Sequence, residues 1–360
     1  MSEEKKEKDS GMKWVIVADI MIAVVVLLLL WASFIERNLA KEQYAKNTND
    51  LMKDAVQVAD IEAKKSYDFD LDIKPSDCQG VEGKVDVMLI SDANYMDFTR
   101  VAILSAIKNK CPLTEYNFHI MTMDLEEGDD VALKNLETDG AKIFLYPQKE
   151  IDLFYIRDTH VSKTSLLKYY IADVLKDLDK VIYIDSDVLV LQDLNKLYNT
   201  DVEGKYLAAV KDPSWFFENG HVLELNLEER GFYFNSGVML MNLKKIRDDN
   251  LVAKLEDYTN NNFRTYMDQD ALNVVVGNDV LLLDVEYNTM NFFFAHNPLN
   301  VLSEFYGKNW STLEEVFSNA TILHFASSKK PLGAVVEKTD FFFMLQKLWY
   351  RYYGELSPLS

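Results

Sequence analysis

The chain has 360 residues, of which 58 are acidic and 38 are basic, so its formal net charge at pH 7 is −20. Binding to nucleic-acid phosphates depends mainly on clustered cations, and this charge balance therefore argues against a nucleic-acid partner. Hydrophobic residues make up 48% of the chain and aromatic residues 12%, which excludes a disordered acidic tail. The length is that of one large domain or two smaller ones.

An apolar segment lies near the N-terminus. Residues 14–35 are apolar apart from Asp19 and Ser33, a run long enough to cross ~30 Å of hydrocarbon as a helix. The run is too long for a signal peptide and lacks an A-x-A-like cleavage site. We therefore expect a charged tail over residues 1–13 and an uncleaved transmembrane anchor over 14–35.

The next segment, residues 36–83, is predicted to be a stem and linker. Up to residue 70 it is polar and free of Gly and Pro, with apolar residues at loose helical spacing, which indicates a helical stem. The turn-rich residues 75–83 mark the boundary of a folded domain over 84–360. Cys78 and Cys111 are too few for a disulfide-rich scaffold or a four-thiolate zinc site, and form either one bridge or two buried thiols.

The folded region alternates short apolar runs with helical patterns, which is typical of a mostly parallel sheet covered by helices. The predicted strands are residues 85–91, 118–123, 142–146, 180–184, 206–211, 237–241, 280–284 and 321–325. The predicted helices are residues 98–109, 162–178 and 267–276. In such sheets ligands bind beyond the carboxyl ends of the strands, so polar residues at those ends are the candidate site.

The C-terminal residues 341–353 mix aromatic side chains with Lys347 and Arg351. They predict either a helix that packs on the core or a helix at a membrane surface, where Trp, Tyr and basic residues are favoured.

The most informative strand end is the sequence KVIYIDSDVLV. An apolar strand ends at Asp185, Ser186 and Asp187, and residues two apart in extended backbone point to the same side, so the two carboxylates converge. Like charges raise each other's proton affinity unless a cation lies between them. Mg²⁺ or Mn²⁺ meets that need, because such ions are held by one or two carboxylates and by substrate phosphates. Solvated acids that close a strand are the alternative.

Six motifs occur in the order LISDANYMDFTRVAILSAIKN, DLDKVIYIDSDVLVLQDLNKLYN, FNSGVMLMNL, MDQDALN, LLLDVEYN and ILHFASSKKPL. With them, the region from about residue 84 to the C-terminus resembles glycosyltransferase family 8, which contains glycogenin and the bacterial lipopolysaccharide galactosyl- and glucosyltransferases. The resemblance implies a GT-A fold, an α/β architecture with a Rossmann-like, mixed and mostly parallel sheet flanked by helices, here preceded by the transmembrane helix and helical stem. It also implies transfer of glucose or galactose from a UDP-sugar with retention at the anomeric carbon, assisted by Mn²⁺ or Mg²⁺.

The resemblance implies roles for residues of the donor site. Asp92 and Asn94 match positions that contact uridine and ribose, and Tyr95 beside them is placed to stack on uracil. Lys330 matches a lysine that neutralises the diphosphate, a role that suits a point charge. Asp185 and Asp187 match the metal-binding pair, which His324 completes, and imidazole is a suitable ligand for Mn²⁺.

The transferred sugar is implied to lie among a further group of residues. These are Asn235 and the triplet Asp268, Gln269 and Asp270, with Asp268 and Gln269 as the catalytic residues. Lys168, near the donor phosphate or sugar, and Ser186 complete the donor-binding residues that the resemblance implies. The triplet also fits the start of a helix, where Asp complements the helix dipole.

Some positions depart from the family's pattern. Lys168 stands where many relatives have arginine, which keeps the charge and loses the bidentate fork. Ala93 replaces a frequent acid, Ser327 replaces a glycine, and Leu332 replaces a tryptophan. Since no metal ligand is lost, we expect an altered but active site, with inactivity as the alternative.

Two other functions remain open. VIYIDSDVLV also fits the motif of haloacid-dehalogenase-like phosphatases, in which Asp185 would be the nucleophile and Asp187 the acid and base. That motif usually lies on the first strand, and His324 and Lys330 would then have no role. The other alternative is a non-catalytic domain that binds sugar nucleotides or glycans.

The predicted partners are a nucleotide-sugar donor, an acceptor that is a glycan, a lipid-linked sugar or a protein, and the membrane. More basic residues precede the apolar segment than follow it, which weakly favours a cytoplasmic N-terminus. The predicted localisation is therefore a single-pass membrane protein. It would have Golgi-type II topology in a eukaryote, and would lie at the inner membrane with a cytoplasmic catalytic face in a bacterium.

Overall fold

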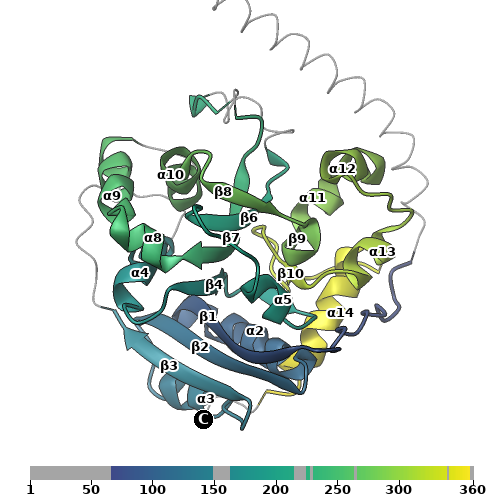
Figure 1. Cartoon of the computed structure of the whole chain (residues 1–360). Helices are drawn as coiled ribbons and strands as arrows, with labels where there is room; N and C mark the ends of the chain where they lie inside the picture. Colours follow the sequence, from purple (N-terminus) through teal and green to yellow (C-terminus); the bar gives the residue numbers. More distant parts are fainter. Residues whose placement is uncertain are drawn as a thin grey trace, which may run out of the picture. The chain divides into compact units, whose positions relative to one another are not determined.

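The computed structural model describes residues 66–148, 163–214, 224–227, 230–262, 266–338 and 340–356. The main sheet contains β1 (Glu82–Asp92), β2 (Leu113–Met123), β3 (Ala141–Pro147), β4 (Lys180–Ile184), β6 (Leu207–Lys211), β7 (Phe234–Asn242) and β8 (Val280–Leu283). Their order is β3-β2-β1-β4-β7-β6-β8 (Figure 1). All neighbouring strands pair in parallel except β7, which is antiparallel to both β4 and β6. The predicted mixed, mostly parallel sheet is confirmed.

A second, three-stranded sheet contains β5 (Val188–Val190), β9 (Thr289–Met290) and β10 (Ile322–His324). The central strand β10 is antiparallel to β5 and parallel to β9. The sequence predicted a strand over 321–325 but did not predict this separate sheet, because β5 and β9 are only 3 and 2 residues long. The register pairs His324 with Val188, which follows the aspartate pair directly.

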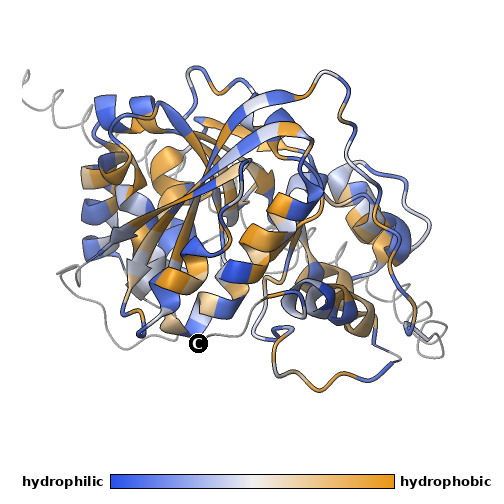
Figure 2. Ribbon diagram, turned by 90° about the horizontal axis from the view of Figure 1, so that it is seen from below, coloured by the Kyte–Doolittle hydropathy of each residue, from blue (hydrophilic) through white to orange (hydrophobic). Residues whose placement is uncertain are grey.

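Helices cover both faces of the main sheet, and apolar residues, orange in Figure 2, gather in the interior between them. One face packs against α2 (Met96–Asn109), α3 (Asp129–Lys134) and α5 (Asn195–Tyr198). The other packs against the 3₁₀ helix η2 (Lys163–Tyr170), α4 (Ile171–Val174), α8 (Leu243–Asp248), α9 (Leu251–Asn261) and α10 (Met267–Val276). Val87 and Leu89 of β1 contribute to the first core and Met88 and Ile90 to the second, so β1 is buried on both faces.

A third core lies around the small sheet. It includes side chains of α11 (Asn291–His296), α12 (Leu299–Tyr306), α13 (Leu313–Ser318) and α14 (Phe342–Tyr353). Trp349 of α14 is fully buried and lies 5.4 Å from Phe98 of α2, measured between ring centroids. Of the two predictions for residues 341–353, the structure therefore has the helix packed on the core.

The described part of the predicted helical stem is not helical, which corrects that prediction. Residues 66–70 have no helical hydrogen bonds, and Tyr67, Phe69, Leu71 and Ile73 alternate with polar residues as in an extended chain. These side chains pack into the third core, which favours an extended path over a helix. Residues 36–65 lie outside the described part of the chain.

The predicted transmembrane helix and the membrane localisation that depended on it also need correction, while the membrane as a partner stays a prediction. Among the described residues no helix is long and apolar enough to cross a membrane. The longest of these helices, α2, has 14 residues, whereas a span needs about 20 apolar residues. Residues 1–13 and 14–35, to which the tail and the anchor were assigned, lie outside the described residues. The structure supports the GT-A part of the predicted fold and not the anchor.

The chain divides into two compact units, Met1–Ile61 and Glu62–Ser360, and all described residues belong to the second. The domain boundary predicted at residue 84 stays a prediction.

Cys78 and Cys111 form a disulfide, which decides between the two alternatives that the sequence left open. The bridge joins residues 33 positions apart and restricts the unfolded chain. Replacing Cys78 by Ser and Cys111 by Ala is therefore expected to lower the free energy of unfolding by about 2–4 kcal/mol, measured by urea denaturation of the full-length protein. The wild type in reductant should lose a similar amount, and an unchanged urea midpoint in both experiments would contradict the prediction.

Candidate functional site

The reversed direction of β7 determines which residues meet at the carboxyl end of β4. Because β7 is antiparallel to β4, its first residues lie at the edge of the sheet where β1 and β4 end. The N–H of Asp185 donates to the carbonyl oxygen of Gly237 at 2.7 Å. Asn235 and Ser236 therefore lie beside the aspartate pair. Asp268 and Gln269, in the first turn of α10, contact the same two residues.

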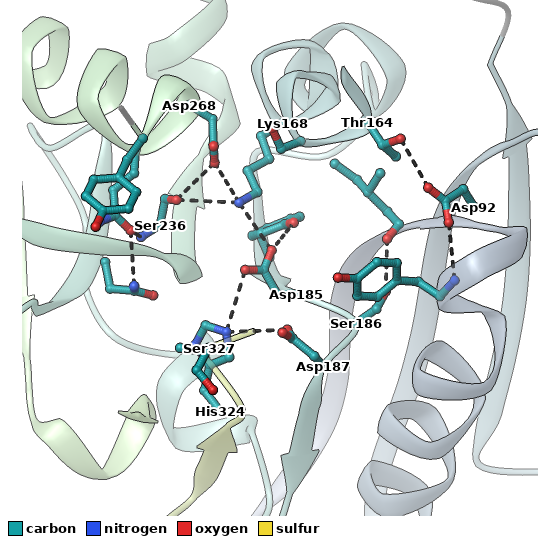
Figure 3. Close-up of a pocket in the computed structure, with 18 of the residues that line it drawn as sticks. Asp92, Thr164, Lys168, Asp185, Ser186, Asp187, Ser236, Asp268, His324 and Ser327 are labelled. Atoms are coloured by element: carbon teal, nitrogen blue, oxygen red, sulfur yellow. Dashed lines mark hydrogen bonds and ion pairs between the residues drawn. The ribbon is translucent and has the colours of Figure 1, made fainter. Parts of the chain in front are cut away.

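These elements surround a cavity of ≈ 470 Å³ (Figure 3). The predicted site residues that line it are Asp92, Tyr95, Lys168, Asp185, Ser186, Asp187, Asn235, Asp268, Gln269, His324 and Lys330. Ser327 also lines the cavity, whereas Asn94 and Leu332 are exposed outside it. The structure thus brings together residues from the ends of four strands, from η2 and from the first turn of α10.

Asp185, Asp187 and His324 form the one group of potential metal ligands found among the described residues. His324 Nε2 lies 3.4 Å from Asp187 Oδ1 and 3.7 Å from Asp185 Oδ2. Neighbouring ligand atoms bound at about 2.1 Å to one ion lie about 3.0 Å apart, so His324 Nε2 needs to approach each carboxylate by less than about 1 Å. The three ligand atoms all lie within 4.8 Å of one another. Two carboxylates and an imidazole are also a donor set that suits Mn²⁺. The residues therefore fit a divalent cation.

Two lysines compensate the charge of the aspartate pair. Lys330 Nζ pairs with Asp187 Oδ2 and also donates to the carbonyl oxygen of Phe325 at 2.8 Å. Burial alone would raise the pKa of Asp187, but the ammonium group of Lys330 is the largest of the opposing causes, and that pKa is held well below its ordinary value. Asp187 is therefore ionised at neutral pH.

Lys168 provides the second cation and is fully enclosed. Its Nζ lies 2.8 Å from Asp268 Oδ2 and 3.2 Å from Asp185 Oδ1, so one ammonium group joins the metal-ligand cluster to α10 (Figure 3). Burial lowers the pKa of Lys168, but the two carboxylates outweigh it and raise the pKa above its ordinary value. The lysine at this position is charged and is held by two acids at once.

The opposite wall is formed by the end of β1. Asp92 Oδ1 accepts from the N–H of Tyr95 at 3.2 Å and so begins the 3₁₀ turn η1 (Ala93–Tyr95), and its Oδ2 accepts from Thr164 at 3.4 Å. The Tyr95 side chain is 38% exposed at the rim of the cavity. Ser186 donates its hydroxyl to Ile90 O at 2.9 Å, which joins the aspartate segment to β1. This interaction gives Ser186 a supporting position.

Sequence reasoning missed Asp212, which lies behind the predicted residues at the end of β6. Its Oδ2 accepts from Asn235 Nδ2 at 3.0 Å and from Gln269 Nε2 at 3.2 Å. The amide oxygen of Gln269 accepts in turn from the N–H of Ser236 at 3.0 Å. Asp212 thus orients two cavity amides, and its position at a strand's carboxyl end was the available signal. Asp270, in contrast, is fully buried against Tyr233 and does not line the cavity.

Gly237 was also missed, because its role depends on a close approach that no local pattern reveals. A Cβ at this position would lie 2.3 Å from His324 Cε1 and 2.7 Å from Asp185 Oδ2. Glycine is therefore required at this position of β7, because a side chain would occupy the space in which the imidazole and the carboxylate meet.

Comparisons with known proteins agree with this arrangement. Residues 86–332 match the sequence profile of glycosyl transferase family 8. The lipopolysaccharide 1,2-glucosyltransferase of Escherichia coli is 29% identical over 285 residues, which are 77% of this chain and 80% of that protein. General stress protein A of Bacillus subtilis is 30% identical over 182 residues, which are 49% of this chain and 61% of that protein.

The solved structure of galactosyltransferase LgtC in complex with donor and acceptor sugar analogs superposes with a TM-score of 0.61. The sequences are 22% identical, and the match covers 77% of this chain and 98% of that one, which supports the fold. The chain spans 63% and 61% of the lengths of two of its curated relatives.

A methyl group at Gly237 should weaken binding of a divalent cation. In Gly237→Ala either the His324 ring or the Asp185 carboxylate must move, so we expect the affinity for Mn²⁺, measured by calorimetric titration, to fall by about tenfold or more. Gly354→Ala is the control, because its methyl would meet nothing closer than Tyr350 O at 3.2 Å, far from the cavity. Equal affinity in Gly237→Ala and the wild type would contradict the prediction.

Proposed function

Because the chain belongs to glycosyl transferase family 8, we propose that it transfers a hexose, glucose or galactose, from a UDP-sugar to an acceptor with retention at the anomeric carbon. The observation that carries the proposal is the convergence of Asp185, Asp187 and His324 on a cavity that two lysines also line. A cavity lined by both metal ligands and lysine ammonium groups suits a diphosphate, since it offsets charge from two sides.

The Asp185, Asp187 and His324 side chains would hold Mn²⁺ or Mg²⁺. When bound, the ion would offset the negative charge that develops on the UDP leaving group. Lys330 lies beside Asp187 and would contribute a second positive charge toward the diphosphate. Asp92 and Tyr95 at the end of β1 would receive the nucleoside, with the Tyr95 ring available for stacking at the rim.

The transferred sugar would lie against Asn235, Asp268 and Gln269. Gln269 Oε1 accepts from Ser236 N–H and from Asn235 Nδ2, so Gln269 would act as a fixed dipole at the reacting carbon. Asp268, paired with Lys168, would orient a sugar hydroxyl group. In the reaction the bond from the anomeric carbon to the diphosphate would break and a bond to the acceptor oxygen would form on the same face, with the acceptor's hydroxyl proton passing to the departing UDP.

The acceptor would be a glycan, a lipid-linked sugar or a protein. A glycan acceptor is supported by the similarity to an enzyme whose name describes glucosyl transfer to lipopolysaccharide. The family assignment favours glycosyl transfer over the phosphatase alternative, and Asp185 follows the fourth strand along the chain rather than the first.

The test is incubation of the full-length protein with UDP-glucose or UDP-galactose and Mn²⁺, with UDP release as the readout. Asp187→Ala removes a buried metal ligand and should lower the rate by about 100-fold or more, as should chelation of the metal. Asp201→Ala removes an exposed carboxylate outside the cavity and should leave the rate unchanged. Release of phosphate from phosphoesters would favour the phosphatase, and tight donor binding without UDP release would favour a binding domain.

The stereochemistry of the product is a separate expectation. Since the donor is an α-linked UDP-hexose, retention predicts an α-linked product, which the coupling constant of the anomeric proton reports in an NMR spectrum. A β-linked product would contradict retention while leaving hexosyl transfer intact.

A further inference from the structure

The two ring nitrogens of His324 have different surroundings. Nε2 faces the carboxylates of Asp187 and Asp185, at 3.4 and 3.7 Å, while Nδ1 lies 2.9 Å from Asn288 Oδ1. His324 is 3% exposed and Asn288 is fully buried. A neutral imidazole carries one proton, and only the unprotonated nitrogen has the lone pair that a metal needs. Whether Nε2 can bind a metal therefore depends on which of the two nitrogens is protonated.

A chain of hydrogen bonds that begins at the backbone N–H of Gly237 determines which ring nitrogen of His324 carries the proton. The N–H of Gly237 can only donate, and it lies 2.9 Å from Asn235 Oδ1. At its other end, Asn235 Nδ2 lies 3.0 Å from a carboxylate oxygen of Asp212, which can only accept. Both contacts require the same orientation of the Asn235 amide, so its oxygen points toward Asn288.

The orientation of Asn288 follows from that of Asn235. Asn288 Nδ2 lies 2.9 Å from Asn235 Oδ1 and donates to it. The oxygen of the Asn288 amide is then the atom that faces His324, and an amide oxygen can only accept. A neutral His324 ring must therefore carry its proton on Nδ1, which leaves the Nε2 lone pair directed at the two carboxylates.

We infer that Asn288 is a positioning residue that fixes His324 in the Nδ1–H tautomer and so prepares Nε2 as a metal ligand. Without Asn288, a proton on Nε2 would gain a charge-assisted hydrogen bond to Asp187, and this bond would compete with the metal. Asn288 does not line the cavity, so it acts through His324 alone. The inference deepens the proposed function and rests on it for the metal, but the tautomer itself belongs to the metal-free protein.

The tautomer is tested first, in the full-length, metal-free protein labelled with ¹⁵N-histidine, at alkaline pH, where the imidazole ring is neutral. The chain has only 5 histidines, and His324→Gln identifies the signal of His324 in two-bond ¹H–¹⁵N spectra. The wild type should show a protonated Nδ1, and Asn288→Ala should move the proton to Nε2. Thr289→Val is the matched control, because it removes the neighbouring hydrogen bond to Val285 O, at 3.1 Å, without touching His324.

Metal affinity is tested next, by titration of the same variants with Mn²⁺ alone. Asn288→Ala should bind Mn²⁺ about 10–100-fold more weakly than the wild type, the usual effect of removing a residue that orients a metal-binding histidine. Asn288→Asp keeps an acceptor for Nδ1–H and should retain the Nδ1–H tautomer and bind Mn²⁺ more tightly than Asn288→Ala. Thr289→Val should bind as the wild type does.

The outcomes separate this inference from the proposed function. An unchanged tautomer in Asn288→Ala, or equal losses of affinity in Asn288→Ala and Thr289→Val, would overturn the role of Asn288. A wild type that shows the Nδ1–H tautomer, lost in Asn288→Ala, but binds no Mn²⁺ would support the tautomer assignment and overturn the proposed metal site.

Discussion

Two carboxylates that converge at the end of one strand must be neutralised, and this requirement organises the cavity. Lys168 and Lys330 lie more than 160 positions apart in the sequence, yet each pairs with one member of the aspartate pair. Removing one partner of a buried ion pair leaves an uncompensated charge, which is costly, so these contacts hold η2 and the segment after β10 against β4. The charges that we propose to bind the donor therefore also keep the walls of the cavity together.

The fold supplies this meeting point through one reversed strand. If β7 ran parallel to β4, its first residues would lie at the opposite edge of the sheet, away from Asp185. The antiparallel direction places Asn235 and Gly237 beside the aspartates, and the small sheet brings the His324 ring next to Gly237 and the aspartates. The site therefore requires a mixed sheet, because a fully parallel sheet would not place these residues of β7 beside the aspartates.

The sequence predicted well those features that depend on neighbours along the chain. The apolar run over 180–184 and the two-residue period after it correctly indicated that Asp185 and Asp187 point to one side. The strand over 85–91 was found for the same reason, because its apolar residues are continuous. The separate small sheet was missed because strands of 2 and 3 residues carry no periodic signal. The helical stem was wrong in its last residues because tertiary packing of Tyr67 overrode the local pattern.

Within the site, the acidic and basic groups were accessible to sequence reasoning and the glycine and amides behind them were not. Asn288 lies in a motif that was singled out, but its orientation depends on Asn235, 53 positions earlier, and on a backbone N–H of β7. Hydrogen-bond chains of this kind depend on how the strands are arranged in space, and the spacing of residues along the sequence does not reveal that arrangement.

The pairing of β5 with β10 also has a consequence for synthesis of the protein on the ribosome. His324 meets Val188 across a separation of more than 130 residues, so a nascent chain carries both aspartates long before their imidazole partner emerges. During that interval Asp185 and Asp187 have neither His324 nor Lys330 beside them. Of their two lysine partners, only Lys168 has then been synthesised. Maturation of the site is therefore a late event in translation, and a chain that stops before β10 would be an incomplete protein rather than a smaller version of the same one.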